Sequence, residues 1–324
     1  MKLRLGTRGS DLARTQSAHI AGLLARQGIE ASLVVITTSG DRSDASSFGA
    51  IGPQGVFVRE IEQALLAREV DLAVHSYKDL PTASPPGLVV AAVPPRRDPA
   101  DWLLRKRGQS PFSSSSSETP SPPDRKRALT PFSGLRRIGT ASARRQAWLR
   151  HFCPGVEAAP LRGNVPTRLK RLVDGGFDAI VLAGAGIERL DEGSDVLAAA
   201  LAEVECVRLD PAAFVPAPAQ GALAVQCRDD DTAIRDALAA IDDEASRRAV
   251  AIERAALALA EAGCDAAFGA YARAAGTGFA LKLMTERDGR ILTAEVSGAA
   301  DDDPAALAAE AIAALAPAAR GSAA

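Results

Sequence analysis

Residues 2–37 read KLRLGTRGSDLARTQSAHIAGLLARQGIEASLVVIT, and this stretch decides the fold class. Lys2–Thr7 predicts a strand. Asp11 can cap a helix that runs to about Gln27, because the apolar residues between them recur near a period of 3.6. Ser32–Thr37 predicts a second, buried strand. A strand, a helix and a strand in this order indicate an α/β unit with a largely parallel sheet.

The same rhythm continues through the first hundred residues and returns after an interruption. Residues 106–134 are rich in Ser and Pro and low in complexity, so they predict a mobile surface loop or linker. On either side, short apolar runs predict strands at 71–75, 88–93, 137–140, 156–160 and 178–182. Helical patterns lie at 56–68, 142–151 and 167–173. The sequence therefore predicts two α/β domains.

The last hundred residues change to a different pattern. A strand at 222–227 and a helix at 231–240 precede a long Ala-rich helix at 244–261, with Gly263 as a C-terminal cap. Alternating stretches at 266–273, 279–284 and 291–296 follow, with Asp288-Gly289 as a hairpin turn, and then a helix at 304–315. We predict domain 1 as 1–98 with 219–240, domain 2 as 99–218 and a small α+β domain 3 as 241–324.

Composition limits the class of protein. The chain has 324 residues, 47% hydrophobic and 24% charged, which is typical of a globular protein of two or three domains. Apolar runs are too short for a bilayer span, and the N-terminus lacks the pattern of a secretory signal. Four cysteines without a CxxC pair and three separated histidines argue against a disulfide scaffold and a metal site. We expect a reduced, cytoplasmic protein that binds no membrane and no metal.

Charge is distributed unevenly along the chain. Between Arg96 and Arg171, 17 Lys and Arg residues face 5 Asp and Glu residues, a net +12. The remainder must carry −14, because the whole chain carries −2. A basic block in an acidic protein indicates an anionic ligand, which composition alone does not identify as nucleic acid, phosphate or carboxylate.

Arginines recur where strands end and helices begin. Helix N-termini offer free backbone N–H groups there, and arginine binds carboxylate or phosphate in a bidentate manner. Solvated helix faces are the simpler explanation for any single member, but the whole set favours one anion-binding cleft. The five positions are Arg8, Arg144, Arg145, Arg162 and Arg168.

Two further segments are candidates for chemistry. HSYKDLPT, residues 75–82, follows a predicted buried strand and places Lys78 beside Asp79, either for acid–base work or as an exposed ion pair in a capped turn. Cys264 follows Gly263 in a loop, where a thiol can be a nucleophile or an attachment point. Cys153, Cys206 and Cys227 fit ordinary packing positions better.

These motifs together make the chain resemble the porphobilinogen deaminase (hydroxymethylbilane synthase) family of tetrapyrrole biosynthesis. The similarity is colinear over nearly the whole length. It rests on LRLGTRGSDLARTQ, TTSGDR, GPQGVFVREIEQALL, DLAVHSYKDLPT, RRDPAD, IGTASARRQAWL, LRGNVPTRL, FDAIVLAGAGIERL, PAPAQGALAVQCR and ERAALALAEAGCDAAFGAYA.

The resemblance implies two domains similar to type II periplasmic binding proteins, which form a cleft, and a third that carries a cysteine. It implies a dipyrromethane cofactor attached to Cys264 and porphobilinogen as the substrate of a monomeric transferase. Asp79 would be catalytic, with Lys78 beside it. Cofactor binding would fall to Arg8, Ser10, Ser76, Lys78, Asp79, Thr140, Ser142, Arg144, Arg145 and Gln220, and substrate binding to Arg8, Arg162, Arg168 and Gln220.

The chain also departs from the family pattern. Gln54 stands where a lysine is common in a flexible loop, and Ala267 replaces a proline downstream of Cys264. Three alternatives remain: a non-catalytic polycarboxylate-binding module, a degenerate family member, and a nucleic-acid-binding protein. The last would require aromatic residues interleaved with the basic block, yet aromatics are only 4% of the chain.

Overall fold

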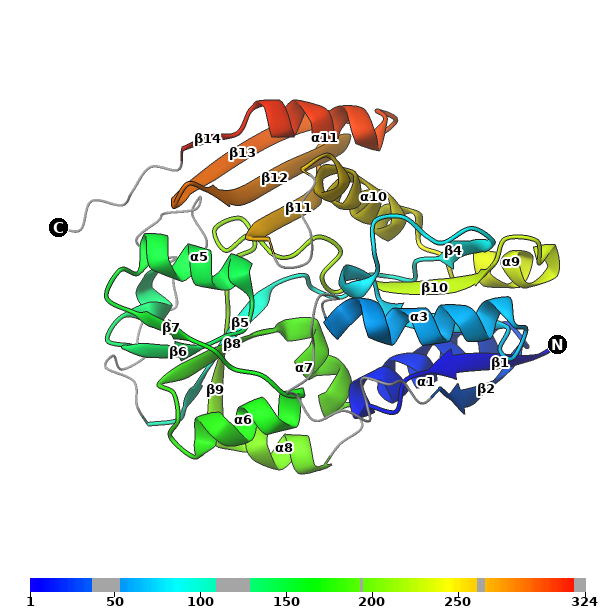
Figure 1. Ribbon diagram of the computed structural model, residues 1–324, viewed down its shortest axis with the longest axis horizontal. Helices are drawn as coiled ribbons and strands as arrows, with labels where there is room; N and C mark the ends of the chain where they lie inside the picture. Colours follow the sequence, from blue (N-terminus) through cyan, green and yellow to red (C-terminus); the bar gives the residue numbers. More distant parts are fainter. Residues whose placement is uncertain (37–52, 109–128, 193–194, 261–265, 318–324) are drawn as a thin grey trace. The chain divides into compact units, whose positions relative to one another are not determined.

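The computed structural model describes residues 1–36, 53–108, 129–192, 195–260 and 266–317 (Figure 1). The chain divides into two compact units. Unit 1 comprises Met1–Arg97 and Ala219–Ala251, and unit 2 comprises Asp98–Pro218 and Ile252–Ala324. The predicted division into three domains stays a prediction.

Unit 1 is built on a five-stranded sheet of order β2-β1-β3-β10-β4. β1, β2 and β3 are parallel, whereas β10 is antiparallel to both of its neighbours. The strands are β1 (Lys2–Thr7), β2 (Glu30–Val35), β3 (Leu72–Ser76), β4 (Leu88–Ala92) and β10 (Leu223–Arg228). The helices are α1 (Asp11–Ala25), α3 (Pro53–Leu66) and α9 (Thr232–Ala239).

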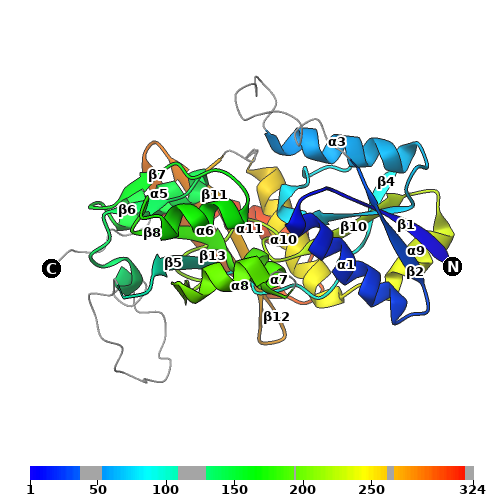
Figure 2. The ribbon, with the colours of Figure 1, turned by 90° about the horizontal axis from the view of Figure 1, so that it is seen from below.

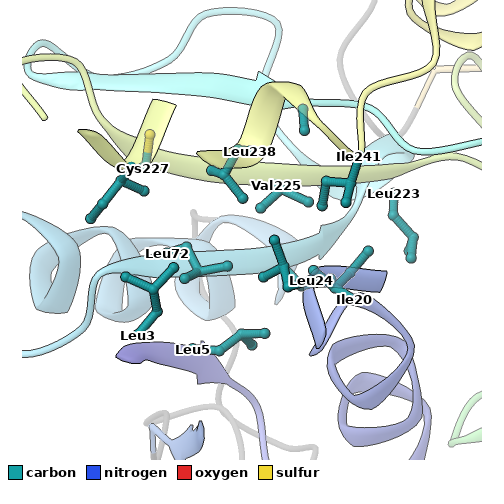
Figure 3. Packing of buried hydrophobic residues seen from close by; sticks show 13 residues of the cluster. Leu3, Leu5, Ile20, Leu24, Leu72, Leu223, Val225, Cys227, Leu238 and Ile241 are labelled. Carbon is teal, nitrogen blue, oxygen red and sulfur yellow. The ribbon is translucent and has the colours of Figure 1, made fainter. Parts of the chain in front are cut away.

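The helices of unit 1 cover both faces of its sheet. α1 contributes Ile20 and Leu24 to a buried cluster that includes Leu238 of α9, and Figure 3 shows these side chains against Leu72 and Val225. α3 lies on the opposite side from α1 (Figure 2), where its apolar residues meet the other sheet face. This arrangement confirms the predicted strand–helix–strand unit, since the α1 pattern faces the core as its period requires.

Unit 2 repeats the same topology with different residues. Its sheet has the order β7-β6-β8-β5-β9, with β5 antiparallel to β8 and β9. In both sheets the antiparallel strand is the first one formed after the chain crosses from the other unit. The strands are β5 (Asp101–Lys106), β6 (Arg137–Gly139), β7 (Glu157–Ala159), β8 (Ala179–Ala183) and β9 (Val204–Arg208). These two sheets confirm the predicted pair of α/β domains.

Helices again flank the sheet of unit 2. The core on one face gathers Trp148 of α5, Phe132 and Phe214, whose rings lie 4.5–6.2 Å apart. The helices are α5 (Ala143–Phe152), α6 (Val165–Val173), α7 (Gly184–Asp191) and α8 (Asp195–Ala202).

A second sheet of unit 2 has the order β11-β12-β13-β14. It comprises β11 (Phe268–Ala275), β12 (Gly278–Arg287), β13 (Arg290–Ala299) and β14 (Ala316–Pro317). Asp288 and Gly289 both have positive φ, of 50° and 69°, which confirms the predicted hairpin turn. α11 (Pro304–Ala313) packs on β12 and β13 (Figure 1), and α10 (Glu244–Leu259) precedes the sheet. The predicted cap Gly263 lies outside the described residues.

Three expectations need correction. β2 is an edge strand rather than a buried one, so Leu33 and Val35 are exposed. The predicted 106–134 loop is wrong at its C-terminal end, because Thr130–Phe132 forms a 3₁₀ turn that buries Phe132. Residues 109–128 lie outside the described ranges. β5 and β9 have no counterpart in the predicted strands.

Gly184 permits a close approach at the start of α7. A Cβ atom there would lie 2.3 Å from Nε1 of Trp102 on β5. We expect Gly184→Ala to reduce the free energy of unfolding by roughly 1–3 kcal/mol, because the indole must shift within a packed site. Chemical denaturation followed by tryptophan fluorescence measures it. The control Gly155→Ala meets open space and should change stability by less than about 0.5 kcal/mol. Equal values for both would refute the packing argument.

Candidate functional site

The candidate residues of unit 1 share one edge of its sheet. β1 and β3 are parallel neighbours, so Arg8 after β1 and Tyr77–Asp79 after β3 lie at their carboxyl ends. β10 runs the other way, and its first residue, Leu223, pairs with Ser76 at the end of β3. The chain before β10 therefore brings Gln220 to the same edge.

Ser10 begins α1 at this edge. Its side chain accepts a hydrogen bond from the Ala13 N–H at 3.4 Å and so caps the helix. Ser76 is held from the same helix, since Gln16 Nε2 donates to Ser76 Oγ at 2.8 Å. Gln16 is buried, and sequence reasoning missed it. A polar residue four positions from both Leu12 and Ile20 on the apolar face of α1 was the available signal.

Asp79 lies partly buried beside two cations. Burial raises the pKa of its carboxyl group above the ordinary value, and the charges of Lys78 and Arg8 oppose that rise. A carboxylate in such surroundings interacts strongly with any positive charge that develops nearby. The motif is therefore more than the exposed ion pair that the sequence left open.

His75 lies buried at the end of β3. Burial lowers its pKa to about 4; a hydrogen bond with Gln226 opposes this shift, and the charge of Arg8 adds to it. Gln226 also donates through Nε2 to Glu62 Oε1 at 3.1 Å. Burial raises the pKa of Glu62, against the effects of Gln226 and Arg59. A neutral imidazole thus lies at the end of β3, two residues before the Tyr77–Asp79 turn.

Gln220 lies in a constrained turn. Ala219 has φ of 60° and Gly221 has φ of 88°, so two left-handed residues flank it. A non-glycine residue in this region costs free energy and is common at functional sites. Gln220 is buried, and its carbonyl oxygen accepts a hydrogen bond from Arg96 Nε at 2.8 Å. The turn fixes where the Gln220 backbone lies relative to β10.

The candidate residues of unit 2 follow the same rule. Thr140 follows β6, Arg162 follows β7, and β5 contributes its amino end, where Asp101 pairs with Ala183 of β8. Thr140 Oγ1 accepts a hydrogen bond from the Ser142 N–H at 3.2 Å. Ser142 is the N-cap residue of α5, yet its side chain makes no capping hydrogen bond.

Arg144 and Arg145 bind a carboxylate of the chain itself. Their exposed fractions are 3% and 7%, and Asp101 between them is fully buried. Arg144 Nη2 donates to Asp101 Oδ2 at 2.7 Å, and Arg145 Nη2 donates to Asp101 Oδ1 at 2.7 Å. Sequence reasoning missed Asp101 and treated both arginines as ligand-binding groups. Their role toward a ligand stays a prediction, whereas the internal ion pairs are observed.

Arg162 and Arg168 flank the start of α6. Gly163 has φ of 114°, and Asn164 caps the helix by accepting from the Thr167 N–H at 2.9 Å. Arg168 Nε donates to the Gly163 carbonyl at 2.7 Å. Burial and the nearby charge of Arg145 lower the pKa of the Arg168 guanidinium, and Arg162 is exposed. An anion placed here would relieve the repulsion between Arg145 and Arg168.

The five arginines therefore divide between the units. Arg8 belongs to unit 1, and the other four belong to unit 2. Cys264 and the side chain of Gln54 lie outside what the structure describes. Nowhere in the described ranges do three His, Cys, Asp or Glu side chains gather as a metal site would need. Among the described helices, none has the length and apolar character that a bilayer crossing requires.

The buried His75 predicts a pH dependence of stability. Its pKa falls from 6.5 to about 4 on folding, so the folded state takes up the proton less readily than the unfolded state. Stability is complete above pH 6.5 and is lost as pH falls toward 4, by roughly 3 kcal/mol in total. Chemical denaturation at pH 7 and pH 4.5 should show a smaller loss for His75→Gln than for wild type. Parallel curves would contradict this.

Two sequence comparisons with known proteins agree on one family. A family model described as "Porphobilinogen deaminase, dipyromethane cofactor binding domain" matches residues 3–236. Porphobilinogen deaminase of Nocardia farcinica is 44% identical over 270 residues, which is 83% of this chain and 70% of that protein. The Mycobacterium leprae enzyme of the same name is 44% identical over 271 residues, 84% of this chain and 77% of that protein.

Among solved structures, an ancestral cationic amino acid solute-binding protein is similar with a TM-score of 0.39 at 14% identity. The match covers 73% of this chain and 86% of that one. The sequence comparisons determine the family. The family model covers the candidate residues of unit 1 from Arg8 to Gln220 and those of unit 2 from Thr140 to Arg168. The chain belongs to the porphobilinogen deaminase family.

Proposed function

We propose that the chain is a hydroxymethylbilane synthase, a transferase that joins four porphobilinogen molecules head to tail on a dipyrromethane primer. Ammonia and a linear tetrapyrrole are the products. Family membership supports the reaction and the cofactor. The observation that carries the chemistry is the partly buried Asp79 carboxyl beside Lys78 and Arg8. The polycarboxylate-binding alternative leaves Asp79 and Cys264 without a role.

The residues of unit 2 fit a polyanionic cofactor. Each pyrrole of a dipyrromethane carries an acetate and a propionate. Arg144, Arg145 and Arg168 bring three guanidinium groups, of which Asp101 neutralises one. Carboxylates of a ligand would lower the electrostatic cost of the remaining positive charge. Ser142 at the start of α5 adds a hydroxyl that is not used for capping.

When bound, the dipyrromethane supplies the terminal pyrrole carbon to which new units are joined. We propose that Cys264 holds it through a thioether. Arg8, Ser10, Ser76 and Gln220 of unit 1 are proposed as further contacts to ligand carboxylates. Arg162 and Arg168 are proposed for the incoming substrate.

Asp79 is proposed to act on the porphobilinogen that loses its amino group. Departure of ammonia leaves a cation delocalised over the pyrrole ring. The Asp79 carboxylate stabilises that cation, and the raised pKa of Asp79 also lets it donate a proton to the leaving amine. The charges of Lys78 and Arg8 favour the ionised form of this carboxyl, and both residues are proposed to bind ligand carboxylates. That the enzyme is a cytoplasmic monomer stays a prediction from the sequence.

Asp79→Asn separates catalysis from stability. We expect kcat for tetrapyrrole formation to fall by about 10²–10³-fold, because the neutral amide cannot stabilise the cation. The same change should increase the free energy of unfolding at pH 7, since the raised pKa means that ionised Asp79 disfavours the folded state. Product absorbance and chemical denaturation measure the two effects.

The matched control is Asp236→Asn on an exposed turn of α9 in the same unit, which should alter neither quantity. Full activity of Asp79→Asn in a correctly loaded enzyme would overturn the assigned role of Asp79.

Intact mass tests the cofactor and its attachment. Wild type should exceed the polypeptide mass by two linked pyrrole units, and porphobilinogen should add further units in steps. Cys264→Ser should show the bare mass, whereas the control Cys206→Ser, at an exposed cysteine, should keep the increment. A bare wild type, even after incubation with porphobilinogen, would overturn the proposed function.

A further inference from the structure

β11 is the edge strand of the second sheet of unit 2 and begins four residues after Cys264. Unpaired N–H groups on an edge strand must find other acceptors. The Ala270 N–H donates to the Pro216 carbonyl at 3.0 Å. The Ala272 N–H donates to the buried Glu253 carboxylate at 2.9 Å. Two amides on one strand therefore depend on two different anchors.

Residues 214–216 form the first of these anchors. A Cβ atom at Gly269 would lie 2.9 Å from the Val215 carbonyl oxygen and 3.1 Å from that of Pro216. Only glycine allows β11 to approach this segment so closely. The position of residues 214–216 therefore determines where the first half of β11 lies.

Arg144 fastens that segment to the first sheet of unit 2. Its Nη1 donates to the Val215 carbonyl at 2.6 Å, and its Nη2 donates to Asp101 Oδ2 at 2.7 Å. Its guanidinium carbon also lies 5.6 Å from the centre of the Phe214 ring. The planar group thus bridges the start of β5 and the residue preceding Pro216.

Arg145 has different neighbours. It shares Asp101, but its Nη1 donates to the Val181 carbonyl of β8 at 2.9 Å, and its charge acts on Arg168. Within the described ranges, the hydrogen bonds of Arg145 go to Asp101 and Val181 and not to residues 214–216. The two adjacent arginines of α5 therefore contact different segments, Arg144 the chain at Val215 and Arg145 the strand β8.

We propose that Asp101 and Arg144 are positioning residues that hold residues 214–216, and through them β11, in place. This inference rests on the proposed function, in which the chain just before β11 carries the cofactor. Neither residue needs to touch substrate. Loss of the bridge should loosen the Ala270 anchor and reduce cofactor loading.

The test compares Arg144→Met with Arg145→Met, and with Arg171→Met at an exposed position of α6 as control. Hydrogen exchange at single-residue resolution in the holoenzyme reports Ala270 against Ala272. In Arg144→Met, protection of Ala270 should fall about tenfold more than that of Ala272, because one buried charge-assisted hydrogen bond is lost. The loaded fraction by intact mass should also fall.

Arg145→Met should leave the Ala270 anchor intact. The ratio of Ala270 to Ala272 protection should stay near that of wild type, because Arg145 donates to Val181 and not to Val215. Arg171→Met should change nothing. If Arg144→Met does not fold, Arg144→Lys and Asp101→Asn give the same comparison with smaller perturbation.

Equal loss of protection at both amides would mean a general loss of stability and would overturn the proposal. So would an exchange ratio that changes equally in Arg144→Met and Arg145→Met. Failure of the proposed function is distinguishable from failure of this inference. The first appears as a wild-type mass without two pyrrole units, and the second appears in the ratio of Ala270 to Ala272 exchange.

Discussion

One antiparallel strand in each five-stranded sheet determines which residues share an edge. β10 and β5 enter their sheets against the direction of their neighbours, so their amino ends meet the carboxyl ends of parallel strands. Backbone hydrogen bonds fix this register and leave little freedom for sliding. Gln220 and Asp101 thereby arrive at the same edges as the loops after β3 and β8. Each unit thereby brings polar groups from distant parts of the sequence to one edge of its five-stranded sheet.

The charged groups at the two sheet edges differ in arrangement. In unit 1 the Asp79 carboxyl is partly buried beside Lys78 and Arg8. Burial raises its pKa, and the two positive charges reduce that rise. In unit 2 a fully buried carboxylate is surrounded by guanidinium groups in excess. Buried ion pairs contribute little net stability, because desolvation offsets attraction. Their geometry nevertheless fixes the positions of both guanidinium groups relative to β5.

The periodic elements could be predicted from the sequence, because local patterns determine them. The Lys2–Thr7 strand, the α1 helix and the Asp288-Gly289 turn all have strong local signals. β5 has a short apolar run between charged residues. Its first residue, Asp101, is buried and pairs with Arg144 and Arg145, which lie 43 and 44 positions further along the chain. Such partners are invisible to any local pattern. The exposure of β2 likewise depends on its place at the sheet edge.

The arginine pair shows what motif matching leaves undecided. Arg144 and Arg145 are adjacent on α5, and the same family motif covers both. A helix turns by about 100° per residue, so adjacent side chains point in different directions. Arg144 and Arg145 nevertheless both reach Asp101. Beyond Asp101 they diverge, one toward Val215 and the other toward Val181. Two identical residue types in one motif therefore have separate physical tasks, and only their long-range contacts distinguish them.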